Sequence, residues 1–294
     1  MKTENSKFKL SVQGDNLIYE NPNMLSLDLT LDCGQSFRWS KNDDGHWCAV
    51  VGSDNGNIKP LFAELEQNES LGPITFYNTT EEEFFSIWVP YLDLDRDYSK
   101  ICETLSADKN IKEAILEFPG IHILNQDPWE TICSFIISQN NNIPRIKGII
   151  DRMCEAFGTP IKGVDGLYSF PSAERIAKLE PEDLAPLRAG FRNKYIIDAA
   201  RKIVTNEVDL LKTKTLPLIE AEEELIKIKG VGSKVAQCAL LYGLGHIDGF
   251  PIDVWVKRIM AEMYPEGLPK CVKGYEGIAQ QYLFHWRRNS IKFN

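Results

Sequence analysis

Lys234 and Asp253 are the two residues of this chain whose types and positions most directly suggest chemistry. Lys234 lies at the predicted start of a helix, after the segment KGVGS and before the apolar run VAQCALL. A helix N-terminus disfavours an ammonium, and so do apolar surroundings, so both effects are expected to lower the pKa of this amine. A neutral amine can attack a sugar C1′ and form a Schiff base. A solvated surface lysine at a helix start has the same sequence pattern, so the motif alone leaves both interpretations open.

Asp253 lies nineteen positions after the lysine, between Pro251 and the predicted helix VWVKRIMAEMY. An aspartate at this place is typical of a helix N-cap. A carboxylate held opposite the amine could also stabilise an oxocarbenium-like sugar while a C–N bond breaks. The two roles are compatible, and we expect both.

Two glycines, Gly230 and Gly232, separate the helix-like segment IEAEEELIKI from the helix that begins near Ser233. Glycines permit a tight hairpin and let backbone N–H groups approach an anion closely. Such a hairpin can hold a DNA phosphate without reading the sequence. It is no nucleotide P-loop, because that motif needs four residues between its glycines and here there is one. A plain helix C-cap and turn would show the same pattern.

The charge of the chain is unevenly distributed. The formal net charge is −9, which on average argues against contacts with phosphates. Residues 1–120 carry −11 by count, so residues 121–294 carry +2. The second part can therefore present a local basic face.

Bulk composition indicates a globular protein without a metal or cofactor. With 294 residues and 43% apolar content, the chain can bury a full core and suggests two domains. No apolar run approaches the roughly 20 residues of a membrane span, and the start MKTENSKFKL lacks a secretory signal, so we expect an intracellular location. The cysteines show no C-x-x-C or other close metal spacing, which argues against a disulfide framework and against a zinc or iron-sulfur site. They lie at positions 33, 48, 102, 133, 154, 238 and 271.

The elements that must position these residues fall into two parts. Residues 25–77 alternate and turn often, which predicts antiparallel sheet, and EEEFFSIWVPYL predicts a helix that breaks near Pro90. After about residue 111 the pattern is helical nearly throughout, with roughly eight to ten short helices separated by Gly and Pro. We therefore expect an α+β protein. Residues 1–115 should form a domain built from a twisted antiparallel sheet and flanking helices. An α-helical domain carrying the hairpin is expected in residues 116–294.

Residues 225–260 closely resemble the helix-hairpin-helix Gly/Pro/Asp signature of base-excision DNA glycosylases. Four further segments resemble 8-oxoguanine DNA glycosylase/lyases in the same order along the chain, and SQNNN-x-x-R and GQSFRW are the most specific motifs. The segments are LDLTLDCGQSFRW (27–39), QDPWETICSFIISQNNNIPRIKGI (126–149), AGFRNKYIIDAA (189–200) and AQQYLFHW (279–286). The resemblance implies a bifunctional enzyme that flips out and excises 8-oxoguanine from duplex DNA, then cuts the strand by β-elimination.

By this resemblance, Lys234 is the nucleophile and lyase residue, and Asp253 is its carboxylate partner. The resemblance also implies a base pocket. Lys234 and Cys238 share one helix face at i, i+4, as Gln280 and Phe284 share another. Cys238 and Phe284 would then sandwich the flipped purine, while Gln280 bonds its Watson–Crick edge. Without the resemblance, Phe284 and Cys238 would be ordinary core residues and Gln280 an ordinary surface residue.

Gly34, the glycine of GQSFRW, is implied to discriminate the lesion. Guanine has a bare acceptor at N7, whereas 8-oxoguanine has an N7–H there. A backbone carbonyl aimed at that atom would bond the lesion and repel guanine, and glycine allows the close approach. A β-turn or bulge alone would also explain a glycine at this place.

The resemblance further implies that the partner is double-stranded DNA with 8-oxoguanine opposite cytosine. We expect the protein to bind this DNA as a monomer and to have no membrane partner. Asn140, Arg145 and Arg192 match residues that fill the gap and contact the orphaned cytosine, and Phe191 matches the wedge. The vertebrate-like pattern has tyrosine at Phe191 and histidine at Trp255, so the resemblance fixes neither the strictness of the cytosine preference nor a phosphate contact near Trp255.

Two other functions share parts of this pattern. Alkylated-base glycosylases share the hairpin and the aspartate but lack the lysine, so Lys234 argues against them. A non-catalytic DNA-binding module could be built on the same hairpin. Borohydride trapping on 8-oxoguanine DNA separates the three.

Overall fold

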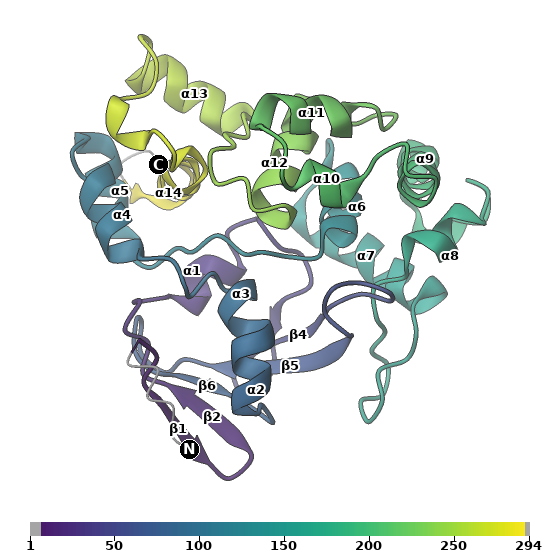
Figure 1. The fold of residues 1–294 in the computed structure, drawn as a ribbon, viewed down its shortest axis with the longest axis horizontal. Coiled ribbons are helices and arrows are strands. Elements are labelled where there is room, and N and C mark those ends of the chain that lie inside the picture. The colour runs from purple at the N-terminus through teal and green to yellow at the C-terminus, as the bar shows by residue number, and fades with distance from the viewer. Residues whose placement is uncertain (1–6, 292–294) are drawn as a thin grey trace.

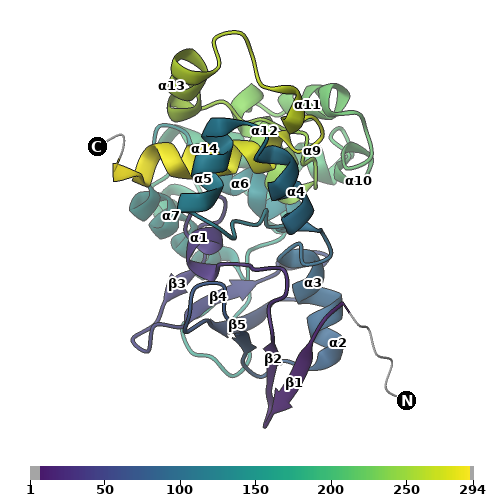
Figure 2. The same ribbon diagram turned by 90° about the vertical axis from the view of Figure 1, so that its left-hand side faces the viewer.

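The computed structural model describes residues 7–291. Figures 1 and 2 show an antiparallel sheet at one end of the molecule and a group of helices at the other. Residues 118–127, which belong to no helix or strand, run between these two bodies. Ile121 and Ile123 pack into the core of the helical body, whereas Leu124 packs into the core of the sheet body. The boundary between the bodies is therefore a packed interface.

All the paired strands of the sheet are antiparallel, in the order β1-β2-β6-β5-β4-β3. The buried face alternates along β5, where Ala63 and Leu65 point inward, and the inner residues of the neighbouring strands follow the same period of two. The strands are β1 (Leu10–Gln13), β2 (Asn16–Tyr19), β3 (Ser40–Lys41), β4 (Trp47–Val51), β5 (Leu61–Glu66) and β6 (Ile74–Phe76).

One helical segment covers the inner face of the sheet. It begins at α2 (Glu81–Glu83), where Thr80 forms a capping box with Glu83. It continues through the π-helical turn η1 (Phe84–Trp88) into α3 (Val89–Tyr91). Phe84 and Trp88 pack against Phe76 of β6 with ring centroids 5.3 and 5.4 Å apart. This confirms a helix over residues 81–91, and it ends just after Pro90.

The prediction of sheet for the alternating segment LSLDLTL is wrong. Residues Leu27–Leu31 form the short helix α1. Ser26 caps this helix by accepting from the backbone N–H of Leu29, and Leu27, Thr30 and Leu31 are buried. The capping serine and the burial of residues three and four apart outweigh the period of two in the sequence.

The helical body is built around α6 (Pro128–Ser138), most of whose residues are buried and which packs against α12 (Ser233–Gly243). Its other α-helices are α4 (Tyr98–Leu105), α5 (Lys109–Glu117), α7 (Ile143–Phe157), α8 (Ala173–Ala177), α9 (Asn193–Val204), α10 (Leu210–Thr213), α11 (Leu218–Ile226), α13 (Val254–Met263) and α14 (Glu276–Asn289). Three short 3-10 turns complete it, namely η2 (Ala185–Leu187), η3 (Gly190–Arg192) and η4 (Lys270–Val272).

The segment GQSFRW fastens the two bodies together. The Gln35 side chain donates to the carbonyl of His122 over 2.8 Å and accepts from the N–H of Leu124 over 2.9 Å. The Arg38 guanidinium lies 3.4 Å from the Glu130 carboxylate, and both side chains are nearly buried. Burial raises the pKa of Glu130 to about 7, although Arg38 opposes this shift. These buried bonds hold the preceding residue, Gly34, at the edge of the helical body.

The expected α+β architecture, a twisted antiparallel sheet followed by helices with a hairpin, is confirmed. A domain boundary near residue 115 stays a prediction; that position lies within α5, and α4 and α5 both contribute residues to the core of the helical body. Within the described residues no helix is long and apolar enough to cross a membrane. Nor does any group of three or more His, Cys, Asp or Glu in the described range have an arrangement that could hold a metal ion.

Candidate active site

Lys234 occupies the first turn of α12, directly after the hairpin that joins this helix to α11. Its side chain is half-buried, and its ammonium lies 4.9 Å from the centroid of the Phe135 ring of α6. Lys234 has no ion-pair partner among residues 7–291. The amine is therefore held over an aromatic face without a carboxylate to bind it.

The hairpin adopts the backbone that its glycines predict. Gly230 has φ +80°, and a Cβ there would come within 2.4 Å of the Tyr195 ring, so both the conformation and the space require glycine. Gly232 is the N-cap of α12, and no side chain caps this helix. The first N–H groups of α12 are thus left for an anion, together with the positive end of the helix dipole.

Asp253 caps α13, as its position predicts. One carboxylate oxygen, Oδ1, accepts from the backbone N–H groups of Trp255 and Val256 over 2.9 and 2.8 Å. The other oxygen, Oδ2, accepts no hydrogen bond from the described residues. The cap therefore fixes the carboxylate and leaves one oxygen for the cleft.

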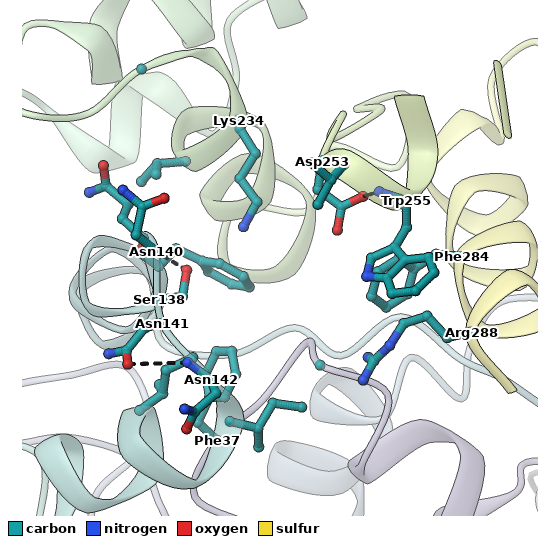
Figure 3. A pocket seen from close by; sticks show the side chains of 18 of the residues that line it. Phe37, Ser138, Asn140, Asn141, Asn142, Lys234, Asp253, Trp255, Phe284 and Arg288 are labelled. Atoms are coloured by element: carbon teal, nitrogen blue, oxygen red, sulfur yellow. Dashed lines mark hydrogen bonds between the residues drawn. The ribbon is translucent and has the colours of Figure 1, made fainter. Parts of the chain in front are cut away.

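Lys234 and Asp253 line one cleft of about 820 Å³, called here the outer cleft. Figure 3 shows the two side chains reaching into the same space from different helices, with Phe284 and Arg288 on the wall below Asp253. The opposite side is closed by the last residue of α6, Ser138, and by Asn140, Asn141 and Asn142 of the loop that follows. Gly34 lines the outer cleft from the sheet body, so residues from both bodies meet there.

A smaller space of about 40 Å³, called the inner cavity, adjoins the outer cleft and shares Lys234, Asp253 and Gly34 with its lining. Cys238 and Gln280 line it and are 3% and 4% exposed, and Phe284 forms its half-buried side. Burial raises the pKa of the Cys238 thiol, and the neighbouring Lys234 works against this rise. At this size the cavity holds only a few water molecules, so a purine could enter only after the side chains move apart.

The backbone carbonyl of Gly34 is free to accept a hydrogen bond from a ligand. Gly34 has φ +86°, a conformation that favours glycine. The carbonyl of Cys33 accepts from the Gln281 side chain over 3.1 Å, and the carbonyl of Gln35 accepts from the Gln126 side chain over 2.6 Å. No donor within the described part of the chain reaches the Gly34 carbonyl between them. Two of three successive carbonyls are thus fixed by buried amides, and the middle one is left without a partner.

Sequence reasoning missed two residues of this site. Gln281 is buried and links the bodies, because it bonds the Cys33 carbonyl and also accepts from the Tyr242 hydroxyl over 2.7 Å. Arg288 lines the outer cleft and lies over the Phe284 ring at 5.1 Å. The spacing of Phe284 and Arg288, i and i+4 on a helix, is the one sequence signal that could have placed Arg288 at the site.

The predicted DNA-contacting residues do not all lie free at the surface. Phe191 is 50% exposed, and Arg145 and Asn140 are exposed. Arg192 is buried instead, where it donates to the backbone carbonyls of Gln139, Asn140 and Ala189. In this state Arg192 supports the loop that holds Asn140.

Trp255 lines the outer cleft, as a residue near the DNA would. The guanidinium of Arg258 lies 5.2 Å from the centroid of its ring. Aromatic rings with cations above them therefore occur on both helices at the Asp253 side of the cleft, at Trp255 on α13 and at Phe284 on α14.

Comparison with known proteins gives this arrangement a family. Residues 17–132 match the model of the 8-oxoguanine DNA glycosylase N-terminal domain, and residues 133–268 match that of the HhH-GPD superfamily base excision DNA repair proteins. The N-glycosylase/DNA lyase of Saccharomyces cerevisiae is 33% identical over 262 residues, which cover 83% of this chain and 69% of that protein.

Solved structures agree over nearly the whole length. MBOgg1 in complex with a low affinity DNA ligand superposes with a TM-score of 0.85 at 38% identity, covering 98% of this chain and 99% of that one. The Clostridium acetobutylicum 8-oxoguanine glycosylase/lyase in complex with DNA containing cytosine opposite 8-oxoguanine gives the same TM-score at 34% identity, covering 96% and 98%. The resemblance stated from the sequence motifs is thereby confirmed, and the chain belongs to the 8-oxoguanine DNA glycosylase/lyase family of base-excision repair enzymes.

Proposed function

We propose that this chain excises 8-oxoguanine from double-stranded DNA and then cuts the strand 3′ to the lesion, with Lys234 as the nucleophile. The observation that carries the proposal is the convergence of three groups on one cleft. These are the Lys234 amine, the Asp253 carboxylate and the loop with the unbonded Gly34 carbonyl. An amine and a carboxylate suit glycosidic bond cleavage, and the carbonyl suits the reading of a damaged purine.

In the proposed reaction the damaged nucleotide flips out of the duplex and its base enters the inner cavity. The Lys234 amine attacks C1′, the C1′–N9 bond breaks, and its electron pair leaves with the base. One amine proton goes to the departing base, and the second goes to O4′ as the C1′–O4′ bond breaks and the nitrogen forms the C1′=N bond of the Schiff base. Loss of a C2′ proton then expels the 3′ phosphate by β-elimination, which cuts the strand.

Asp253 is proposed to stabilise positive charge on the sugar while the C1′–N9 bond breaks. Its Oδ1 is fixed by two backbone N–H groups, and its Oδ2 accepts no bond from the described residues, so one oxygen is positioned for this task. A carboxylate that is already oriented by the protein needs little reorganisation when charge develops.

The base pocket is proposed to form from Cys238, Phe284 and Gln280 once the inner cavity widens. The first two would lie on the two faces of the purine, and Gln280 would bond its Watson–Crick edge. Gln280 accepts one long bond of 3.5 Å from Tyr242, which leaves its amide NH₂ available. The Gly34 carbonyl would accept from N7–H of 8-oxoguanine and repel the bare N7 of guanine.

The surrounding surface is proposed to hold the duplex. The hairpin of Gly230 and Gly232 would bind a phosphate through the first N–H groups of α12. Phe191, exposed on η3, would act as the wedge, and Asn140 and Arg145 would contact the orphaned base. The chain is also proposed to act on DNA as a monomer inside the cell. Trp255 is proposed to lie beside the backbone of the damaged strand.

The experiment for this proposal measures single-turnover excision from duplexes with 8-oxoguanine opposite each of the four bases, and from undamaged duplex. We expect excision to be fastest opposite cytosine and strand cleavage to follow it, with no excision of guanine. Equal release of guanine and 8-oxoguanine would contradict the proposal. Release of an alkylated base without trapping would instead favour an alkylated-base glycosylase, and DNA binding without excision would favour a non-catalytic module.

Replacement of Gly34 by alanine tests the proposed reading of N7–H. At φ +86° an alanine is strained, while its Cβ would meet only Phe284 and Arg288 at 3.9 and 4.0 Å. We expect relief of the strain to turn the carbonyl away and to lower the excision rate of 8-oxoguanine by about tenfold.

Gly45 offers a matched control in the turn between β3 and β4, because it has φ +85° and a Cβ added there would meet no described atom within 4 Å. Gly45→Ala should incur a similar strain without loss of excision. If Gly34→Ala excises 8-oxoguanine at the wild-type rate while both variants lose similar thermal stability, Gly34 does not read the lesion.

A further inference from the structure

We propose that Arg288 is a second lesion-reading residue, whose guanidinium donates a hydrogen bond to O8 of 8-oxoguanine beside the Gly34 carbonyl. The inference rests on the proposed function and adds a contact on the atom that distinguishes the lesion most directly. In this proposal the protein recognises two adjacent atoms of the lesion. The Gly34 carbonyl accepts from N7–H, and the Arg288 guanidinium beside it donates to O8.

The guanidinium of Arg288 lies close to Gly34. Arg288 lies one turn after Phe284 on α14, and its guanidinium is 5.1 Å from the centroid of that ring. The direction in which a side chain would leave Gly34 leads to two atoms, Phe284 Cε1 at 3.9 Å and Arg288 Nη1 at 4.0 Å. The guanidinium therefore lies at the Gly34 end of the outer cleft, where Figure 3 shows it directed into the cleft.

Arg288 differs from arginines whose guanidinium groups are bonded within the protein. Arg38 is paired with Glu130, and Arg192 is bonded to backbone carbonyls. Arg288 forms neither a hydrogen bond nor an ion pair with any residue in the described range, although it is only partly exposed. Its contact is the Phe284 ring, which orients the planar group without engaging its N–H donors.

His285 and the Asp32 carboxylate that acts on it are titratable groups near Arg288, and among the described residues neither forms a hydrogen bond or an ion pair with its guanidinium. His285 is its neighbour, and burial, together with the charge of Arg288, lowers the pKa of His285 to about 4, so the imidazole is neutral near pH 7. The ring of His285 packs edge-on against Phe118, with the ring centroids 4.6 Å apart. A forked cation at the cleft wall that bonds to no acceptor within residues 7–291 is suited to an acceptor on the ligand.

The chemistry of the lesion supplies this acceptor. Guanine and 8-oxoguanine differ at two adjacent atoms, since the lesion has N7–H for a bare N7 and C8=O for C8–H. Once the Gly34 carbonyl faces position 7, a donor next to it faces position 8. Guanine would offer that donor only a C–H group. A hydrogen bond from a charged donor in a site of this kind is worth about 10- to 100-fold.

Arg288 could instead support the Phe284 ring or bind a phosphate, and both roles would affect every base that enters the pocket. A substrate in which sulfur replaces O8 separates these roles, because 8-thioguanine keeps N7–H but offers only a weak acceptor at position 8. Single-turnover excision of 8-oxoguanine and 8-thioguanine is measured for wild type and for Arg288→Met. The four rates form a double-mutant cycle, which gives the coupling between the Arg288 side chain and the atom at position 8 of the base.

We expect Arg288→Met to slow excision of 8-oxoguanine by about 10-fold or more and excision of 8-thioguanine by less than about 3-fold. Equal slowing of both substrates would overturn the inference and assign Arg288 a supporting or phosphate-binding role. No slowing of either would also overturn it. Wild-type excision in the same series tests the proposed function separately, because the inference can fail while 8-oxoguanine is still excised.

Arg287→Met is the matched control. Arg287 is adjacent on α14, but it pairs with Glu262 at 3.5 Å and does not line the outer cleft or the inner cavity. It should leave the ratio of the two excision rates unchanged. Thermal unfolding of both variants checks that α14 is intact.

Discussion

Replacing Lys234 with glutamine is expected to abolish covalent trapping by borohydride and to lower the excision rate of 8-oxoguanine by about three orders of magnitude or more. Glutamine has a similar length but no nucleophilic amine, so neither the attack on C1′ nor the Schiff base can form. The cost to the fold should be small, about 1 kcal/mol, because the main loss is the cation over the Phe135 ring. Single-turnover kinetics and gel analysis of trapped complexes measure both effects.

Lys212→Gln serves as the control for the lost charge. Lys212 is an exposed lysine of α10 and lines neither the outer cleft nor the inner cavity. Its variant should trap and excise as the wild type does. Persistent trapping by Lys234→Gln, with a normal yield, would mean that another amine is the nucleophile.

The second large effect is expected for Asp253→Asn, which should slow excision by about 100-fold while duplex binding is retained. Asparagine caps helices about as well as aspartate does, so the bonds to Trp255 and Val256 can persist. What is lost is the negative charge on the oxygen that faces the cleft. Excision rates measured with the enzyme in excess, together with duplex affinity, separate the chemical step from binding.

Asp209→Asn is the matched control, because Asp209 is also a helix N-cap but lies outside the site. Asp209 caps α10 by accepting from the N–H of Lys212 over 3.0 Å. We expect both variants to change the free energy of unfolding by less than about 1 kcal/mol and only Asp253→Asn to lose activity. If Asp253→Asn loses stability and DNA binding along with activity, its capping role is the dominant one.

The residues that act through local sequence were the most predictable. The start of α12 at Ser233, the turn at Gly230 and the N-cap at Asp253 each depend on neighbours in the chain, and the structure has all three. That Lys234 and Asp253 line one cleft needs the packing of α12 and α13, which their spacing does not determine. The family resemblance supplied that information.

Features that depend on tertiary contacts were missed or misread. The alternation of LSLDLTL predicted a strand, but the cap at Ser26 and burial on one side make it α1. Gln281 gave no signal of its own and Arg288 gave only its spacing from Phe284, because the roles of both residues arise from the Cys33–Gly34 loop of the other body. Long-range contacts of this kind have no period in the sequence.

Arg192 has a structural role that differs from the DNA contact predicted for it. The resemblance predicts a contact with the orphaned cytosine, and that contact stays a prediction. In the structure the guanidinium bonds the carbonyls of Gln139 and Asn140, so it shapes the loop that lines the outer cleft. A contact with DNA would require this arginine to exchange those bonds.

The most direct test of the central claim locates the covalent bond. Wild-type protein is trapped with borohydride on a duplex that contains 8-oxoguanine opposite cytosine, and the complex is digested and analysed by mass spectrometry. The account predicts that the DNA remnant is attached to Lys234, in a peptide that trypsin does not cleave after this residue. A remnant on another amine, such as the nearby Lys229, or the absence of any adduct while 8-oxoguanine is released, would contradict it.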